Sequence, residues 1–271
     1  MIEGFEFKEN YSFDDLLKIV TLLRSPGGCP WDREQTHKSI RANFIEETYE
    51  AVEAIDSGDS DLLREELGDV LLQVALHTEI ERESGGFDIG GVTDGICKKL
   101  IIRHPHVFGD VSADTSDEVL KNWDEIKKRT KGQSSHTETL ESVPRVLPAL
   151  MRSEKVQKRA ARSGFDWQNV SGALSKVHEE LSELEEAIAL GDKASCRGEL
   201  GDLLFAVVNV ARFIDAEPEE ALTRACEKFI KRFSLCEKFA EETDRDMSSM
   251  TPEELDNLWK KAKIVLQSEP E

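Results

Sequence analysis

The stretch EETYEAVEAIDSGDSDLLREELGD, residues 46–69, indicates how the chain folds. It holds two segments of helical character, joined by the polar turn SGDSD. Glu47 and Glu50 are three residues apart on the first segment, so they share one face of its helix. Glu66 and Asp69 have the same spacing on the second segment. The turn folds the two helices antiparallel, and we therefore expect a hairpin in which four carboxylates lie close together.

The second half of the chain repeats this arrangement in EELSELEEAIALGDKASCRGELGD, residues 179–202. Two further pairs of segments occur in the same order: CKKLIIRH resembles CEKFIKRF, and NWDEIKK resembles LWKKAK. The sequence therefore predicts a tandem duplication of one helical unit. A constant separation of 133 residues relates the acids of the two halves, namely Glu47 and Glu180, Glu50 and Glu183, Glu66 and Glu199, and Asp69 and Asp202.

The rest of the sequence also favours helices, because its apolar residues recur at helical spacing and strand-like alternation is nearly absent. Residues 13–24 predict a two-sided apolar helix that begins after Ser12, a suitable N-cap. The most apolar helices, at 62–83 and 196–215, are expected at the centre of each core. We predict an all-α protein with an N-terminal domain over residues 1–130, a linker over 131–147 and a C-terminal domain over 148–271.

Composition narrows the class of protein. The 271 residues include 35 Lys and Arg against 55 Asp and Glu, a net charge of −20, which argues against DNA or RNA as the main partner and favours cations. The sequence has no long apolar run, and its N-terminus lacks a basic region followed by an apolar one, so we expect a cytoplasmic protein without a membrane partner. The five cysteines are scattered and form no Cys-x-x-Cys pair, so neither a zinc site nor a disulfide framework is expected.

The clustered carboxylates predict a metal site. Two like charges about 4 Å apart repel by about 4 kcal/mol at an effective dielectric constant of about 20, so a cation is needed to keep them all ionised. Oxygen ligands imply a hard cation, Mg²⁺ or alternatively Mn²⁺. The apolar neighbours Leu67, Val70, Leu71 and Val74 argue for a core position rather than a solvated helix face. No EF-hand loop occurs, and a di-iron bundle, which needs Glu-x-x-His, is the weaker alternative.

Basic and aromatic residues follow each acidic hairpin. Lys228 and Arg232 are four residues apart, a spacing that suits the outer phosphates of a nucleotide but also ordinary salt bridges within a helix. Trp259 could stack on a base, with Lys263 one turn further on, although packing in a core is an equal alternative. No P-loop motif occurs. The equivalent residues of the first half are Lys99, Arg103, Trp123 and Lys127.

Several motifs resemble those of the MazG family of bacterial nucleoside triphosphate pyrophosphohydrolases. They are GCPWDREQTH at 28–37, EETYE with EELGD, RHPHVFGD at 103–110, SVPRVLPALMRSEKVQKRA at 142–160 and GFDW with GELGDLLFAVVNVAR. The resemblance covers nearly the whole chain. It implies four-helix units, each with an acidic hairpin, that associate into a homodimer. It also implies Mg²⁺-dependent hydrolysis of NTPs and dNTPs to the monophosphate and pyrophosphate.

The resemblance also implies roles for individual residues. The metal ligands would be Glu180, Glu183, Glu199 and Asp202, with Glu47, Glu50, Glu66 and Asp69 as their counterparts. Metal-activated water would attack the α-phosphoryl group, and Glu179 or Glu46, which are not ligands, would orient or deprotonate that water. Lys228 and Arg232 would stabilise the departing pyrophosphate. The nucleotide contacts would be Lys176, Lys228, Arg232, Trp259 and Lys263.

The first half lacks two polar residues of the second. Asn43 stands in place of Lys176, and Leu76 in place of Asn209, which favours the second half as the active unit. Three other functions remain open. The chain could be a specialised relative that acts on dUTP and dCTP or on phosphoribosyl-ATP, against which its GCPWD motif and tandem organisation count. It could be a regulator that binds nucleotides without turning them over, or a structural acidic helical bundle.

Overall fold

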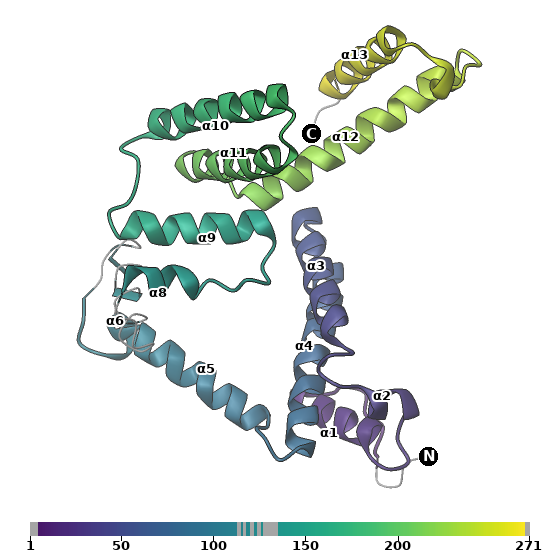
Figure 1. The fold of residues 1–271 in the computed structure, drawn as a ribbon. Coiled ribbons are helices and arrows are strands. Elements are labelled where there is room, and N and C mark those ends of the chain that lie inside the picture. Colours follow the sequence, from purple (N-terminus) through teal and green to yellow (C-terminus); the bar gives the residue numbers. More distant parts are fainter. Residues whose placement is uncertain are drawn as a thin grey trace. The chain divides into compact units, whose positions relative to one another are not determined.

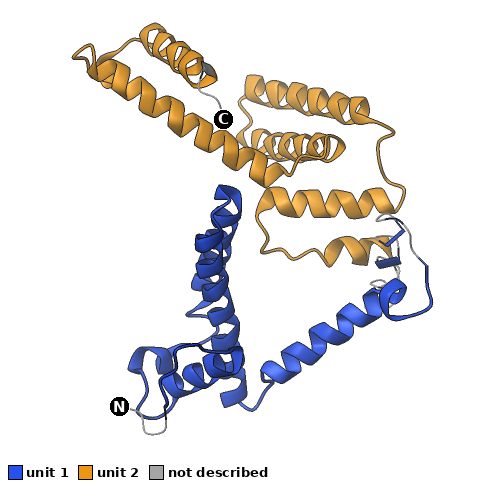
Figure 2. Ribbon diagram, turned by 180° about the vertical axis from the view of Figure 1, so that it is seen from behind, with its two compact units in different colours: residues 1–127 blue, residues 128–271 orange. Residues whose placement is uncertain are grey.

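In the computed structural model, which describes residues 5–112, 115, 118–119, 122–123, 126 and 135–268, every regular element is a helix. This confirms the predicted all-α class. The chain divides into two compact units, residues 1–127 and 128–271 (Figure 2). The first unit holds α1 (Phe13–Arg24), α2 (Pro30–Glu34), α3 (Arg41–Ser57), α4 (Ser60–Glu83), α5 (Ile89–Arg103) and α6 (Pro105–Phe108) (Figure 1).

The second unit runs from α8 to α13. Its helices are α8 (His136–Glu141), α9 (Ala149–Arg162), α10 (Val170–Leu190), α11 (Lys193–Phe213), α12 (Pro218–Glu241), the 3₁₀ helix η1 (Met247–Ser249) and α13 (Pro252–Ser268). The range 131–147, which the sequence predicts as a linker, thus includes α8, and α8 packs against α9. None of the described helices combines the length and the hydropathy that a membrane-crossing segment needs.

Each unit is built around one antiparallel hairpin, α3–α4 in the first and α10–α11 in the second. A glycine followed by an aspartate forms the turn of each hairpin. Gly58 and Gly191 end the first helix of each hairpin at φ +70°, a left-handed conformation that glycine adopts without a Cβ clash. Asp59 and Asp192 then accept hydrogen bonds from the first backbone amides of the next helix. The repeat in the sequence is therefore a repeat of turn chemistry.

The core of the first unit lies between α1, the start of α3 and the middle of α4. Val20, Ile40 and Ala75 are each 1% exposed and pack with Leu76. The predicted N-cap Ser12 is confirmed, because its side chain accepts from the amide of Asp15 in a capping box. A second connection is ionic, since the buried Arg24 of α1 donates to both carboxylate oxygens of Glu83 at 2.9 and 2.8 Å.

The hairpin of the second unit packs through small residues, because Ala173 and Ala187 of α10 and Ala206 of α11 are all buried. Many of its larger apolar side chains lie on the outside, among them Leu181, Leu200 and Leu204, although Val208 is 1% exposed. In the first unit, likewise, Leu67 is 53% and Leu71 39% exposed, so the expectation that these residues place the acidic stretch against a core is wrong for the single chain. A two-helix hairpin has only one inner face, and these leucines are not on it.

Candidate metal and nucleotide site

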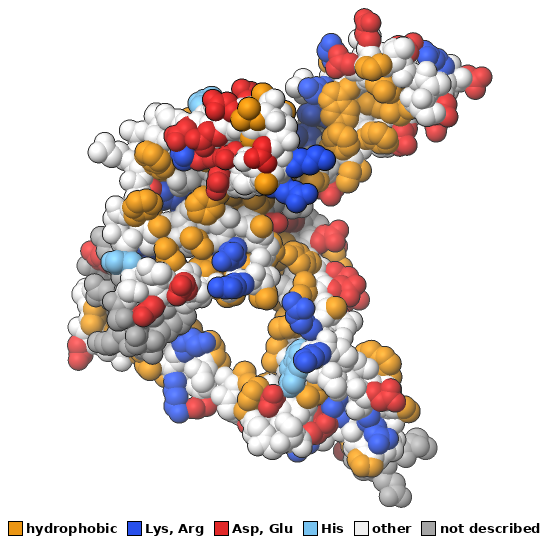
Figure 3. Space-filling model, in the orientation of Figure 1, with side chains coloured by type: hydrophobic (Ala, Val, Ile, Leu, Met, Phe, Trp, Pro, Cys, Tyr) orange, Lys and Arg blue, Asp and Glu red, His pale blue; other side chains and the backbone are white. Residues whose placement is uncertain are grey.

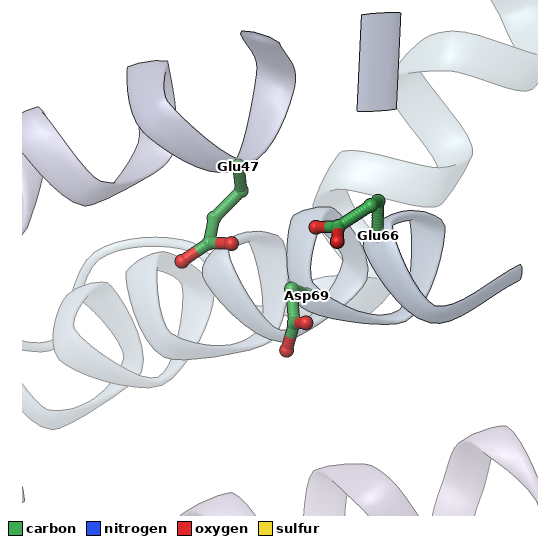
Figure 4. Close-up of side chains that lie close together, drawn as sticks. All are labelled: Glu47, Glu66 and Asp69. Atoms are coloured by element: carbon green, nitrogen blue, oxygen red, sulfur yellow. The ribbon is translucent and has the colours of Figure 1, made fainter. Parts of the chain in front are cut away.

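The first acidic cluster lies between the helices of the α3–α4 hairpin. Oxygen atoms of Glu47 on α3 and of Glu66 and Asp69 on α4 all lie within 4.8 Å of one another. Figure 4 shows the three carboxylates converging from the two helices. Burial, followed by the charges of Asp69 and Glu50, raises the pKa of Glu47. Glu50 is therefore close enough to act electrostatically, although it is not one of the three convergent acids.

The second unit forms the equivalent cluster from Glu180 on α10 and Glu199 and Asp202 on α11, again within 4.8 Å. Glu180 is the most buried of the three, at 5% exposure. Burial, together with the charges of Glu180 and Glu199, raises the pKa of Glu183, which lies beside the three. Acidic side chains gather over α10 and α11 in Figure 3. In each unit the structure thus brings three of the four predicted acids together and leaves the fourth adjacent.

A lysine accompanies the second cluster. Lys176, one turn before Glu180 on α10, lies 2.5 Å from the Glu180 carboxylate and 2.9 Å from that of Glu179. These two hydrogen bonds raise the pKa of Lys176, so its ammonium stays charged. Glu179 is exposed and outside the cluster. The corresponding position of the first unit holds the neutral Asn43, so the second cluster differs from the first by the positively charged Lys176 beside it.

The remaining predicted contacts lie on the last two long helices. Lys228 and Arg232 are on α12, and Trp259 and Lys263 are on α13. The guanidinium of Arg232 lies 5.7 Å from the Trp259 ring centroid, and Phe229 packs on the same ring at 5.0 Å. Within residues 135–268, no described hydrogen bond or ion pair joins these residues to the acidic cluster. The structure therefore assembles the acids and, separately, the pair of Arg232 and Trp259.

The first-unit counterparts are less complete. Lys99 and Arg103 lie on α5, while the Trp123 ring packs edge-on against His104 at 4.9 Å. Lys127 falls outside the described residues. The structure also contains a histidine pair that was not predicted. The rings of His37 and His77 are stacked, with their Nδ1 atoms 2.7 Å apart. No spacing signal relates the two, because they come from different elements.

The donor chemistry of both clusters fits a hard divalent cation. Each offers three carboxylates and no sulfur or nitrogen ligand, the set that Mg²⁺ and Mn²⁺ prefer. Their oxygens already lie within 4.8 Å of one another, so a single ion can contact all three without rearrangement of the helices. Zinc, which favours His and Cys, fits poorly.

Comparison with known proteins also identifies two related domains in this chain. The MazG nucleotide pyrophosphohydrolase domain matches twice, at residues 35–108 and 168–236, and each match contains one acidic hairpin. A Thermotoga maritima protein named nucleoside triphosphate pyrophosphohydrolase/pyrophosphatase MazG is 44% identical over 93% of this chain and 95% of its own length. The Escherichia coli K12 nucleoside triphosphate pyrophosphohydrolase is 44% identical over 92% of this chain and 96% of its own.

A third relative contains a segment similar to this chain within a longer protein. The uncharacterized protein YabN of Bacillus subtilis is 47% identical over 93% of this chain, which covers 52% of YabN. The doubled domain match and the near full-length similarity agree with the duplicated hairpins and their acidic clusters. They confirm the resemblance noted from the motifs, and the chain belongs to the MazG nucleotide pyrophosphohydrolase family.

Proposed function

We propose that this protein hydrolyses nucleoside triphosphates, both NTPs and dNTPs, to the monophosphate and pyrophosphate. The observation that carries the proposal is the convergence of three carboxylates within 4.8 Å in each of two repeats of a pyrophosphohydrolase domain. The Thermotoga and Escherichia relatives, which are named for this activity, support it. A purely structural bundle has no use for two such clusters, since unneutralised carboxylates at this distance repel.

Mg²⁺ is the proposed cofactor, held by Glu180, Glu199 and Asp202, with Glu183 as the adjacent fourth acid. When bound there, the cation polarises the phosphoryl oxygens and lowers the pKa of a bound water. The first unit has the same set in Glu47, Glu66 and Asp69, with Glu50 beside them. Mn²⁺ satisfies the same oxygen ligands and is expected to substitute for Mg²⁺.

The side chains around the second cluster have separable tasks. Glu179 is exposed, is not one of the convergent acids, and adjoins Glu180, so we assign it the orientation or deprotonation of the attacking water. The ammonium of Lys176, which now pairs with Glu180 and Glu179, would bind a substrate phosphate. Lys228 and Arg232 stabilise the charge that develops on the leaving pyrophosphate. Trp259 and Lys263 complete the proposed nucleotide contacts.

We expect turnover mainly in the second unit. Its cluster has Lys176 beside Glu180, whereas Asn43 in the first unit cannot supply charge to a phosphate. The proposed domains are residues 1–130 and 148–271, joined by 131–147. The proposed location is the cytoplasm.

A homodimer is the proposed assembly. Large apolar side chains lie exposed along both hairpins, and they include Ile55 at 59%, Leu67 at 53%, Leu200 at 48% and Leu204 at 50% exposure. Apolar surface of this extent normally marks an interface. A second copy of the same hairpin offers a matching apolar face and would complete a four-helix arrangement. Light scattering coupled to size exclusion should give twice the chain mass of 30.5 kDa, and the chain mass alone would contradict the dimer.

The activity is tested by incubating the full chain with a set of NTPs and dNTPs in Mg²⁺ and separating the products by anion exchange. The wild type should yield monophosphate and pyrophosphate, Glu180→Gln should abolish turnover, and Glu47→Gln should retain most of it. Glu186→Gln, an equal loss of charge on the same helix outside the cluster, is the matched control. Binding without product would instead favour a nucleotide-binding regulator. Turnover confined to dUTP and dCTP or to phosphoribosyl-ATP would indicate a specialised relative.

A further inference from the structure

The second unit contains a cavity of about 460 Å³ that none of the predicted site residues lines. Its volume lies within the range of about 300–1,000 Å³ that small-molecule sites usually have. Three aromatic rings and four polar side chains contribute to its wall, namely Phe165, Trp167, Phe205, Gln157, Asp166, Asn209 and Arg212. The wall therefore combines flat apolar surfaces with a few hydrogen-bonding groups.

The amide of Asn209 has a fixed orientation. Its Oδ1 accepts hydrogen bonds from Nε and Nη2 of Arg212, at 3.2 and 2.9 Å. Arginine has only donors, so the oxygen must face Arg212 and the Nδ2 group must point away from it. Asp166 holds Arg212 in turn, pairing with both terminal nitrogens. Asn209 thus presents an NH₂ donor for which the described residues provide no hydrogen bond.

Gln157 is oriented in the opposite sense. It is 6% exposed, and its Nε2 donates to the backbone carbonyl of Phe205 at 2.7 Å. A carbonyl only accepts, so the NH₂ group must lie on that side and Oε1 on the other. Oε1 is buried and has no hydrogen-bond partner among the described residues. An unsatisfied buried acceptor is destabilising, so this oxygen is able to accept a hydrogen bond from a molecule bound in the cavity.

Residues of α11 that line the cavity follow the acidic cluster toward the C-terminal end of that helix. Asp202, Phe205 and Asn209 have i, i+3 and i+7 spacing, which places them on one stripe of the helix. Seven residues at 1.5 Å each separate the cluster from Asn209 by about 10 Å along the helix axis. A substrate whose α-phosphoryl group lies at the cluster needs a site for its base at about this separation, with the ribose between them.

The first unit fills the equivalent space with side chains. A shift of 133 residues places Leu76 opposite Asn209 and Ile40 opposite Ala173. Leu76 is 5% and Ile40 1% exposed, and both belong to the packed core of that unit. The second unit therefore has a smaller residue and a polar residue where the first has two large apolar ones. Of these positions Asn209 lines the cavity, and its polar side chain where the first unit has Leu76 indicates a ligand site in the second repeat.

We propose that this cavity binds the nucleobase of the substrate, with Asn209 Nδ2 donating to the base edge and Gln157 Oε1 accepting from it. Trp167, Phe165 and Phe205 supply surfaces on which a planar heteroaromatic ring stacks. The assignment rests on the proposed function, because it takes the phosphates to lie at the acidic cluster. Trp259 remains a proposed nucleotide contact, but beside the phosphates together with Arg232, whose guanidinium lies over its ring, rather than by stacking on the base.

Calorimetry tests the assignment with two probes, a nucleoside triphosphate carrying a methylene between its α and β phosphorus atoms, and tripolyphosphate, which has no base. Both are titrated in Mg²⁺ into the full chain carrying Glu47→Gln, which removes a ligand of the first cluster. Asn209→Leu, the residue found at position 76, should weaken nucleotide binding by about ten- to thirtyfold, as expected for one buried hydrogen bond. It should leave tripolyphosphate binding within twofold.

Trp167→Leu provides a second variant at a position less important for folding, because Trp167 is 45% exposed. It should give the same selective loss, while Trp31→Leu, an equal change at an exposed first-unit tryptophan, should change neither titration. Equal weakening of both probes by Asn209→Leu and Trp167→Leu, or no weakening of either, would overturn the base site. If the wild type hydrolyses nucleotides but both variants bind the two probes as the parent does, only this inference is overturned. No nucleotide binding by the parent chain would overturn the proposed function as well.

Discussion

Magnesium should stabilise this protein, and removing one carboxylate of the second cluster should abolish most of the stabilisation that this cluster contributes. The perturbation is Glu180→Gln, which keeps the volume and the helix-forming character of the residue while removing its charge. Glu180 is the natural choice because it is the most buried of the three acids and lies within 4.8 Å of both others. Its loss leaves Glu199 and Asp202 as the only convergent ligands.

The size of the effect follows from linkage. A cation present at 100 times its dissociation constant stabilises the folded state by about 2.7 kcal/mol. For a unit of this size, about 1 kcal/mol shifts Tm by about 2–4 °C, so the expected rise is about 5–10 °C. If the lost ligand weakens binding a hundredfold, the same Mg²⁺ concentration contributes only about 0.4 kcal/mol, or about 1 °C.

Thermal unfolding followed by circular dichroism, with and without Mg²⁺, measures both shifts. The first cluster adds its own contribution, so the decisive quantity is the difference between Glu180→Gln and the matched control Glu186→Gln on the same helix. A rise reproduced by KCl at equal ionic strength would show charge screening rather than a site. An equal rise in both variants would refute the assignment of Glu180 as a ligand.

Three other predictions concern pH and stability. The pKa of Glu183 is raised in the folded state, so the folded state binds more protons than the unfolded state. Glu183 therefore contributes more to the free energy of unfolding as the pH falls from 7 toward 5 in the absence of Mg²⁺. In urea titrations, Glu183→Gln should make the free energy of unfolding depend less on pH over this range. Burial and the neighbouring His37 lower the pKa of His77, so it should titrate below the ordinary value of about 6.5 in NMR spectra and move back toward it in His37→Ala; an unmoved pKa would contradict the pairing. Arg24→Leu should lower the free energy of unfolding by about 1–3 kcal/mol, because it removes the hydrogen bonds of a buried guanidinium while water can still solvate the 37% exposed Glu83 side chain. A loss below about 0.5 kcal/mol in urea would show that the pair is dispensable.

Some site features were predictable because they are local. A glycine that must adopt a left-handed conformation and an aspartate that caps the next helix are visible as Gly58–Asp59 and Gly191–Asp192. Once such a turn is present, helical periodicity places acids three residues apart on one face. The all-α class, the two hairpins and the approximate position of both acidic clusters therefore follow from the sequence alone.

Contacts between helices were not predictable in this way. Which three acids converge depends on the register of α3 against α4 and of α10 against α11, and packing sets that register. Asn209 lines the cavity of the second unit, whereas its counterpart Leu76 is packed into the core of the first. This difference is visible in the sequence, but only the neighbouring helices show whether the space is filled. The exposed positions of Leu67 and Leu71 had no sequence signal, because apolar spacing is the same whether a face meets its own core or another molecule. The sequence by itself determined the helices and the residues that face one way along each of them. Only the tertiary structure decided which of those faces meet, because that depends on side-chain volumes from segments far apart in the chain.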